Sequence, residues 1–527
     1  MQPLYTVQAI RAAEEPLLAA QDYPDELMQS AAHAVAGAAL DMLASVNQHR
    51  SRILVLAGSG GNGGDALYAG AELALAGYRL TAILVGSRPH GPALEAFRNA
   101  GGTVVEAADG EAAEYLDAPR AALAIDGVAG LGGKPGLRPA AQRVVAQLEA
   151  HRVPILSVDL PSGITADHAE TPEPATPADG DLPDHVTACV TVTFGGLRRV
   201  HGLHPACGQV LLAEIATRAG RLSEVLAKQA AEQPGRVTLT RAIERSEYSW
   251  NRGPARALPA FALPSAAEPE ATADKYSQGV AGILAGSPTY PGAGLLCCAG
   301  ALRATPAMVR YVGRDERVVS AYPEVVRSET LEHTGRVQAW VVGPGRGTGE
   351  ETGAELDWLL RRDEPVIIDA DALTVLAESS ALRRLAAGNG RCVLAPHAGE
   401  FARFGVGDGR DRIDAARALA AELNATVLLK GRFTVVAQAD RAAVVDAGHS
   451  WSATPGSGDV LAGVLGALVA GAAARGEQVF GAVVAGCAVH ARAAWLAAQT
   501  EYGPGPIVAS DIAAFLPRAI AQASPRL

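Results

Sequence analysis

One local pattern recurs along this chain and restricts its fold: a short apolar run, then a glycine-rich turn with a polar side chain, then a helix-like segment. The clearest case is Arg52–Ala57, which is followed by the turn Gly58–Asp65 and by the segment Ala66–Ala76. A strand, a glycine-rich turn and a helix in this order are typical of doubly wound sheets. The sequence therefore predicts an α/β protein.

Composition and charge exclude several classes of protein. The 527 residues are 49% hydrophobic and only 19% charged, which predicts two to four domains with sizeable cores. A formal charge of −11 without a basic cluster argues against a nucleic-acid partner. The N-terminus lacks a signal-peptide pattern, and charged residues and glycines interrupt the apolar runs before they reach spanning length, so we expect a soluble, cytoplasmic protein without a membrane partner. The six cysteines lack metal-ligand spacing, and most of them lie in apolar runs where buried free thiols are expected.

The first half predicts one largely parallel sheet after one or two entry helices within Glu14–Met42. Its further candidate strands are Thr81–Val85, Leu123–Val128, Pro154–Leu160, Ala188–Phe194 and Gln209–Ile215. Three strand ends carry a carboxylate or amide beside glycine, in Gly58–Asp65, Asp126–Gly136 and Asp159–Gly163. Because ligands of such sheets bind beyond the carboxyl ends of the strands, these turns predict a ligand site.

The second half repeats the alternation of strands and helices. Its candidate strands are Val280–Ala285, Val337–Val342, Pro365–Asp369, Arg391–Leu394 and Val427–Lys430, followed by a hairpin of Phe433–Gln438 and Ala442–Val445. Thr454–Asp459 then precedes an apolar helix-like run, so backbone N–H groups and the helix dipole would favour an anion there. Taken alone, Asp459 could equally be a helix cap.

The turns of the first half resemble the N-terminal domain of the bifunctional NAD(P)H-hydrate repair enzymes, which also occurs alone as NAD(P)HX epimerase. The resemblance covers about residues 1–220. It implies a domain with a Rossmann-like sheet that interconverts the R and S hydrates. It implies a potassium ion at Asn62, Asp126 and the main chain near Ser162, with Asp159 as the acid/base. The implied hydrate pocket is lined by Gly61, Asn62, Gly63, Gly64 and Asp65, and by Gly130, Leu131, Gly132, Gly133, Lys134, Pro135 and Gly136.

The turns of the second half resemble the C-terminal domain of the same enzymes, an ADP-dependent NAD(P)H-hydrate dehydratase with a ribokinase-like fold. The motifs are Gly343–Gly347, Asp369–Leu373, Pro396–Glu400, Lys430–Thr434 and Gly456–Asp459, within about residues 275–516. The resemblance implies that Asp459 is the base, and that Gly345, Gly347 and His397 contact the substrate. The implied nucleotide site is Lys430, Gly431, Arg432, Phe433, Thr434, Gly456, Ser457 and Gly458. ADP would be the co-substrate, giving AMP and phosphate, and Mg²⁺ is left open as a further cofactor.

Other interpretations stay open at this point. The first half departs from the family pattern at Gly61, Ala66 and Arg198, so it could be a scaffold without epimerase activity. The second half could be a small-molecule kinase of the vitamin-precursor type or a non-catalytic dinucleotide-binding protein. If it is a dehydratase, its co-substrate could be ATP in place of ADP. Asp369 and Asp371 are expected to fix loops rather than hold a metal.

The predicted organisation is two domains, residues 1–230 and 231–527, in a homo-oligomer that acts on the small molecules NADHX and NADPHX. Two stretches have loop composition: the acidic, proline-rich Glu170–Pro183 within the first domain, and Pro254–Asp274, which is expected to be an extended crossing segment.

Overall fold

The computed structural model describes residues 1–45, 52–107, 121–172, 182–231, 235–244, 248–264, 268–305, 308–407 and 411–525. The chain divides into two compact units. The N-terminal unit consists of the described residues of Gln2–Gln233 and Arg245–Pro259, and the C-terminal unit consists of those of Pro234–Glu244 and Ala260–Leu527. The units therefore do not separate at a single point in the sequence.

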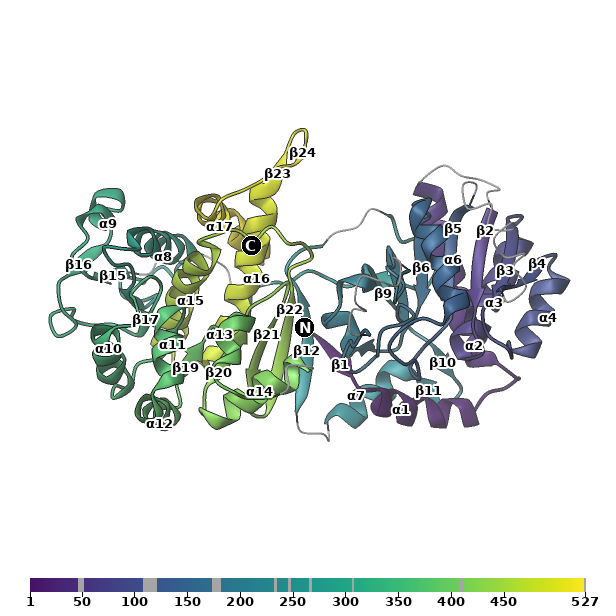
Figure 1. Ribbon diagram of the computed structural model, residues 1–527, viewed down its shortest axis with the longest axis horizontal. Helices are drawn as coiled ribbons and strands as arrows, with labels where there is room; N and C mark the ends of the chain where they lie inside the picture. The colour runs from purple at the N-terminus through teal and green to yellow at the C-terminus, as the bar shows by residue number, and fades with distance from the viewer. Residues whose placement is uncertain are drawn as a thin grey trace. The chain divides into compact units, whose positions relative to one another are not determined.

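The N-terminal unit contains an eight-stranded sheet in the order β13-β9-β7-β6-β5-β2-β3-β4 (Figure 1). Its strands are β2 (Arg52–Ala57), β3 (Arg79–Leu84), β4 (Thr103–Glu106), β5 (Ala121–Gly127), β6 (Ile155–Val158), β7 (Val190–Phe194), β9 (Gln209–Ala213) and β13 (Arg256–Ala257). All neighbouring pairs are parallel except β13 with β9, which confirms the predicted largely parallel sheet. Short strands β1 (Gln2–Tyr5) and β8 (Leu197–Arg198) pair with each other, as do β10 (Ala216–Thr217) and β11 (Gly220–Arg221).

Helices cover both faces of this sheet, as the alternation of its core residues shows. Ile53 and Val55 of β2 belong to a core shared with α1 to α4 and α7, whereas Leu54 and Leu56 belong to a second core shared with α6. The helices are α1 (Val7–Ala19), α2 (Glu26–Ser45), α3 (Gly61–Leu75), α4 (Gly91–Asn99), α6 (Pro139–Ala150) and α7 (Leu222–Ala231). Alternate side chains of a strand face opposite sides of the sheet, so this is a three-layer α/β/α unit.

The C-terminal unit is built on a longer mixed sheet. This unit contributes ten strands to the sheet, in the order β16-β15-β14-β17-β18-β19-β20-β21-β22-β12. They are β12 (Arg236–Arg241), β14 (Val280–Leu284), β15 (Met308–Val312), β16 (Val326–Ser328), β17 (Ala339–Val342), β18 (Val366–Ile368), β19 (Cys392–Leu394), β20 (Thr426–Leu429), β21 (Phe433–Gln438) and β22 (Arg441–Asp446). The pairs β20–β21 and β21–β22 are antiparallel, which confirms the predicted hairpin. The sequence analysis did not find β12, which pairs with β22 over six residues.

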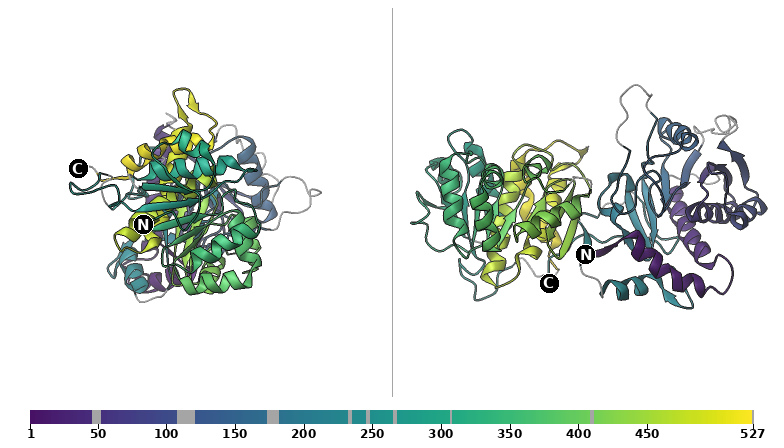
Figure 2. Two further views of the ribbon diagram at one scale, coloured as in Figure 1. Left: turned by 90° about the vertical axis from the view of Figure 1, so that its left-hand side faces the viewer. Right: turned by 60° about the horizontal axis from the view of Figure 1, so that its bottom comes forward.

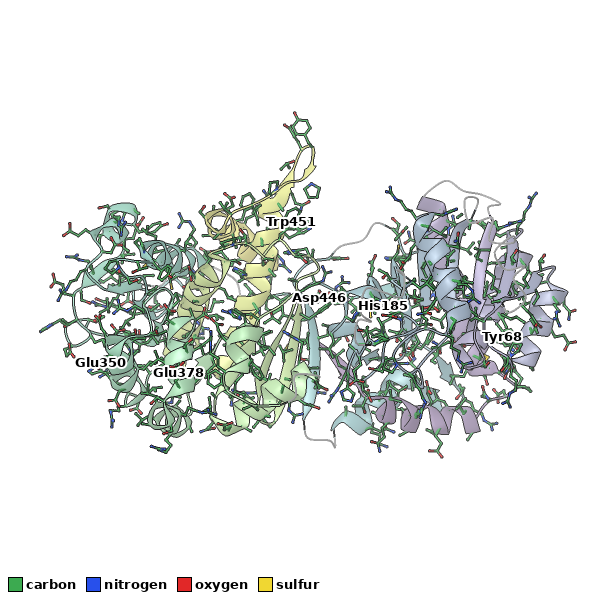
Figure 3. All side chains as sticks on the ribbon, viewed as in Figure 1. Tyr68, His185, Glu350, Glu378, Asp446 and Trp451 are labelled. Atoms are coloured by element: carbon green, nitrogen blue, oxygen red, sulfur yellow. The ribbon has the colours of Figure 1, made fainter. Side chains whose placement is uncertain are left out.

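Helices also cover both faces of the second sheet (Figures 1 and 2). Ala339 and Val341 of β17 pack into a core with α8, α15, α16 and α17, whereas the neighbouring Trp340 packs edge-on against Trp358 of α10. The helices are α8 (Pro291–Ala304), α9 (Glu316–Ala321), α10 (Glu350–Leu360), α11 (Asp371–Glu378), α12 (Ser380–Asn389), α13 (Ala398–Ala402), α14 (Arg412–Glu422), α15 (Ser457–Ala474), α16 (Val479–Ala498) and α17 (Ala509–Ala523). A hairpin of β23 (Gln499–Thr500) and β24 (Gly503–Pro504) follows α16.

Two helices correct the expectation that no apolar run reaches spanning length. Helices α15 and α16 are long and apolar enough to cross a membrane, but 72% and 78% of their apolar windows are buried inside the fold. Both contribute to the core of the C-terminal unit, so their apolar character reflects burial between helices and sheet.

Most of the cysteines are buried, as the sequence predicts. Cys189 is exposed and the other five cysteines are buried, and all six are free thiols. Of the loop Glu170–Pro183, residues 173–181 lie outside the described residues, as do residues 265–267 of the stretch Pro254–Asp274.

Candidate active sites

The first site lies where the order of strands in the N-terminal sheet reverses. Strands β2 and β5 are neighbours there, while β3 and β6 lie on their other sides. Gly58 follows β2 and donates from its N–H to the Gly127 carbonyl, and an added Cβ at Gly58 would lie 1.9 Å from the Val128 carbonyl oxygen. Only glycine allows this approach of the two turns, which explains its position at the end of the strand. Ligands of doubly wound sheets bind at such a reversal.

A cavity of about 1100 Å³ opens at this reversal. Its wall includes the predicted residues Gly61, Asn62, Asp65 and Asp159, together with the whole turn Gly130–Gly136. Gly63 and Gly64 are buried in the first turn of α3 and are not among the lining residues. Pro172 and Asp184, which flank the undescribed part of the acidic loop, also line the cavity.

Asp159 is held rigidly at the cavity wall. It has a φ of +64°, a conformation that Asp adopts more readily than most side chains. Its carboxylate forms an ion pair with Arg198 at 3.0 Å and accepts a hydrogen bond of 2.8 Å from the Thr193 hydroxyl. Both charged side chains are almost completely buried. The predicted acid/base is therefore fixed at the wall by a guanidinium group and a hydroxyl donor.

His201 fixes the main chain of the same residue. Its Nδ1 accepts a hydrogen bond from the Arg198 N–H at 3.0 Å, so the proton resides on Nε2, which donates to the Asp159 carbonyl at 2.8 Å. Burial lowers the pKa of His201 to about 4, although the charge of Asp159 opposes this shift. The imidazole is therefore neutral at neutral pH and serves as a structural support.

Asp126, predicted as a potassium ligand, lies behind the cavity wall. It is completely buried, and its two carboxylate oxygens accept four hydrogen bonds, from the Ser157 hydroxyl, the Val128 N–H, and the N–H and hydroxyl of Ser162. Burial raises the pKa of Asp126, while the hydrogen bonds from Ser162, Ser157 and Val128 lower it. This carboxylate positions the Ser162 turn.

Asn62 connects this network to the wall of the cavity. Its side-chain amide donates to the carbonyl oxygens of Ala129 at 3.3 Å and Val158 at 2.6 Å, and the Ala129 oxygen also lies 3.4 Å from the Ser162 hydroxyl. The structure thus brings the three predicted ligands into one network rich in neutral oxygens. The chemistry of this donor set fits a hard monovalent cation, which prefers oxygen ligands.

Two charged residues of α1 in this wall were not predicted from the sequence. Arg11 and Glu14 are three residues apart on α1 and both line the cavity. An added Cβ at Gly132 would lie 3.2 Å from the Arg11 guanidinium, so this side chain lies over the Gly130–Gly136 turn. In the sequence, Arg11 and Glu14 appear only as part of the charged face of an amphipathic helix. Such a face usually points to solvent, so the sequence does not predict a role for them in a site.

The second site lies at the carboxyl ends of the strands of the C-terminal sheet. Strand order reverses between β14 and β17, where the Gly286 N–H donates to the Pro344 carbonyl at 2.7 Å. Gly345 has a φ of +62°, and an added Cβ would lie 2.8 Å from the Ala293 side chain. Gly347 has a φ of +83° and open space beside it, and its N–H donates to Asp371 at 2.7 Å.

Lys430 follows β20 and forms a short ion pair with Asp369, which follows β18. The Nζ–Oδ1 distance is 2.7 Å, and Glu400 lies 3.8 Å from the same Nζ. Burial lowers the pKa of Lys430, but the carboxylates of Asp369 and Glu400 outweigh burial, so the pKa is raised. The ammonium is therefore charged and oriented. Asp369 and Asp371 act through hydrogen bonds, as the sequence predicted.

Asp459 stands in the first turn of α15 close to this cation. The helix begins after the N-cap Gly456, whose φ of +82° is a left-handed conformation, and an added Cβ at Gly458 would lie 3.7 Å from the Lys430 Nζ. Burial, followed by the charge of Asp369, raises the pKa of Asp459 to about 6, against the opposing charge of Lys430. Pro455 precedes the N-cap and leaves the helix intact.

The first turn of α15 also contains the predicted anion site. The amides of Gly458 and Asp459 lie where a helix offers no acceptor of its own, next to the Lys430 ammonium. Ser457 is buried, and its hydroxyl lies 3.3 Å from the Nε2 of His490 on α16. His490 is a buried residue that supports this turn.

The remaining predicted residues surround the strand ends. His397 caps α13: its Nδ1 accepts hydrogen bonds from the Gly399 and Glu400 N–H groups, and its side chain is 60% exposed. Gly431 and Thr434 form a turn closed by a hydrogen bond from the Thr434 hydroxyl to the Gly431 carbonyl. Arg432 packs over the ring of Phe433. The hydrogen bonds and ion pairs given for His397 and for the described turn Gly431–Thr434 do not involve Asp459.

The fold and the two sites define a class: a two-unit α/β enzyme with a cavity at the strand reversal of one unit, and a carboxylate-lysine pair at a helix N-terminus in the other. Residues 281–518 match the family model described as NAD(P)H-hydrate dehydratase, and residues 24–200 match that of the YjeF-related protein N-terminus.

Relatives match along the whole chain. The bifunctional NAD(P)H-hydrate repair enzyme Nnr of Corynebacterium glutamicum is 41% identical over 99% of each chain. That of Mycobacterium tuberculosis is 42% identical over 90% of this chain and 91% of the relative. A crystal structure of the ADP/ATP-dependent NAD(P)H-hydrate dehydratase from Bacillus subtilis is 28% identical and covers 50% of this chain and 95% of its own, with a TM-score of 0.42. The chain belongs to the family of bifunctional NAD(P)H-hydrate repair enzymes.

Proposed function

We propose that this enzyme repairs hydrated nicotinamide dinucleotides in two steps. The N-terminal unit interconverts the R and S forms of NADHX and NADPHX, and the C-terminal unit dehydrates the S form at the expense of ADP. The observation that carries this proposal is the match to bifunctional repair enzymes over 99% of both chains. Each unit also contributes a polar site at its strand ends, as two successive reactions require.

In the C-terminal unit, Asp459 is the base that takes the proton from the hydroxyl group of the hydrate. A pKa of about 6 leaves it ionised at neutral pH and still basic enough to accept a proton. Lys430 and the first-turn amides of α15 bind the phosphates of ADP, and Asp369 orients the lysine through its 2.7 Å ion pair. Phosphoryl transfer turns the hydroxyl into a good leaving group, and elimination of phosphate releases NADH or NADPH with AMP.

In the N-terminal unit, Asp159 is the group that exchanges a proton with the hydrate in the cavity. Asn62, Ser162 and the carbonyls of Ala129 and Val158 would hold a potassium ion, with Asp126 positioning the Ser162 turn. Such an ion supplies positive charge near the substrate. Mg²⁺ would accompany the phosphates of ADP, because this ion is usually bound through substrate phosphates and a few carboxylates.

The test follows reduced-nicotinamide absorbance after the purified protein is mixed with R and S hydrates. With ADP, we expect both epimers to be consumed, the S form quickly and the R form at the rate of epimerisation. ATP alone and no nucleotide are the comparison reactions. Absence of product with every nucleotide, together with phosphorylation of a vitamin precursor, would favour the kinase interpretation.

Potassium is tested by exchange of the buffer cation for tetramethylammonium, which is too large for an oxygen-lined site. Epimerisation should fall while dehydration of the S hydrate is unchanged. Asp126→Ala should have the same effect, and its melting temperature is measured alongside because the carboxylate accepts four hydrogen bonds. Loss of both activities, or of neither, would contradict the assignment.

A further inference from the structure

Four carboxyl groups line the cavity of the N-terminal unit, those of Glu14, Asp65, Asp159 and Asp184, and among the described residues only Asp159 forms an ion pair. Asp159 is paired with Arg198 at 3.0 Å. Asp65 on α3 and Glu14 on α1 also line the cavity, and no hydrogen bond or ion pair to either carboxylate is present among the described residues. Asp65 is only 9% exposed. A carboxyl group that is buried without a donor or a cation keeps its proton.

The surrounding charges reinforce this distinction. Burial raises the pKa of Asp65 well above its usual value, and the charges of Asp159 and Glu14 raise it further. Burial also raises the pKa of Glu14, with Arg198 and Arg11 opposing and Asp159 adding to the shift. The other charged groups that line the cavity are Lys134, Arg138 and Asp184. Neighbouring acidic groups in unlike environments separate into a proton donor and a proton acceptor.

We propose that Asp65 and Glu14 hold one proton over the cavity and deliver it to the hydroxyl group that leaves the hydrate, while Asp159 accepts the proton of the water that adds. This assignment rests on the proposed epimerase function and adds a proton donor to it. It uses a glutamate from the entry helix for which neither the motifs nor the cavity-lining turns predict a role.

The reaction balances with these groups alone. The substrate carries a hydroxyl on the carbon next to its ring nitrogen. The acid protonates that oxygen, the C–O bond breaks with the electron pair leaving on water, and the nitrogen lone pair forms an iminium ion. Water then adds to the opposite face through a new C–O bond, and its extra proton passes to Asp159. Exchange with solvent in the open cavity then releases the proton from Asp159 and returns one to the Asp65–Glu14 pair.

The experiment compares the wild type with Asp65→Asn, Glu14→Gln and the matched control Glu15→Gln. Glu15 is the next residue of α1, is exposed and does not line the cavity. Purified R hydrate is incubated without ADP, and formation of the S hydrate is followed by chromatography across a pH series, with the spontaneous rate subtracted. Melting temperature and hydrate binding are measured for each variant.

We expect a loss of about 10²-fold or more for Asp65→Asn, in the range typical of a lost general acid. Glu14→Gln should lose about tenfold and change the pH at which the rate falls on the alkaline side, because Glu14 shares the titration of Asp65. Glu15→Gln should match the wild type. An equal loss at every pH with an unchanged profile, or a wild-type rate in Asp65→Asn, would overturn the proposal.

A second measurement separates this proposal from the proposed function. Infrared difference spectroscopy at neutral pH should show the C=O stretch of a protonated carboxyl group that Asp65→Asn removes and Glu15→Gln leaves. If the wild type does not epimerise the hydrate, the proposed function fails, whatever the spectrum shows. If the wild type epimerises but no such band disappears in Asp65→Asn, the proton-donor assignment alone is wrong.

Discussion

At the scale of single residues, a substitution of Asp459 distinguishes a helix cap from a catalytic base. Asparagine caps a helix about as well as aspartate, so Asp459→Asn would be neutral if the residue only capped α15. As a base, the variant should lose roughly 10²–10⁴-fold in dehydratase turnover, because an amide cannot accept the hydroxyl proton. Turnover with S hydrate and ADP is the measurement.

Two controls accompany this variant. Its affinity for ADP should change little, because Lys430 and the main-chain amides remain in place, and its melting temperature should stay close to that of the wild type. A full dehydratase rate with normal stability would show that Asp459 is a cap.

The pH dependence of the dehydratase is a second prediction about the same carboxyl group. Since Asp459 acts in its ionised form and its pKa is raised to about 6, kcat/KM should rise as the pH increases through 6 and then level off. A profile with its acid limb near 4, the usual range of an aspartate, would contradict the burial of this group.

The same shift predicts a change in stability. The folded-state pKa of Asp459 lies above the unfolded value of about 4, so its contribution to stability is fully present below pH 4 and is lost as the pH rises through 6. The free energy of unfolding of Asp459→Asn should therefore decrease less between about pH 4 and pH 6 than that of the wild type. Urea denaturation of wild type and variant across the pH series measures this difference.

At the scale of secondary-structure elements, two glycines allow α8 and α15 to approach closely. An added Cβ at Gly463 would lie 1.9 Å from the Cys297 carbonyl oxygen, and one at Gly300 would lie 2.2 Å from the Val460 carbonyl oxygen. Both contacts are with backbone, which cannot move aside as a side chain can. This packing positions α15, and with it the first turn that contains Asp459.

Gly463→Ala should therefore lower the free energy of unfolding by about 1–3 kcal/mol through overpacking, despite the better helix propensity of alanine. The matched control is Gly353→Ala in the middle of α10, where the nearest atom would lie 3.8 Å away. That variant should gain about 0.5–1 kcal/mol. Urea denaturation measures both, and equal effects at the two positions would contradict the close approach.

At the scale of the whole molecule, the chain passes from the N-terminal unit to the C-terminal unit, back, and forward again. Strand β12 belongs to the C-terminal unit, whereas Asn251 and Arg252 donate hydrogen bonds to Asp41 of α2, and β13 pairs with β9 of the N-terminal unit. Where the chain enters the C-terminal unit again, Arg492 of α16 donates hydrogen bonds to the carbonyls of Ala242 and Phe261. It thereby joins the two segments of this unit that flank residues 245–259.

This path predicts how fragments behave. A fragment of residues 236–527 keeps β12 and should be soluble and dehydrate the S hydrate with ADP at close to the full-length rate. A fragment of residues 260–527 loses β12, so β22 becomes an exposed edge, and we expect lower stability and more aggregation. Circular dichroism melting, light scattering and the dehydratase assay compare them. An insoluble longer fragment that binds no nucleotide would contradict separate folding of the two units.

Local sequence was enough to predict the strand–turn–helix repeats, the parallel sheet, the β21–β22 hairpin and the turns that contain Asp159, Lys430 and Asp459. These features depend on apolar periodicity and on the conformational freedom of glycine, which act over a few residues. The family resemblance then indicated the same turns as the sites.

Only the tertiary structure decided what depends on distance between remote segments. It placed Asp126 behind the cavity wall, paired Asp159 with Arg198, and brought Glu14 of α1 and Asp65 of α3 to the wall of one cavity. It also assigned β12 to the second sheet. The sequence alone could not reveal these outcomes, because the protonation of a carboxyl group and the pairing of a strand are set by burial and by neighbouring charges or strands that folding brings from distant parts of the chain.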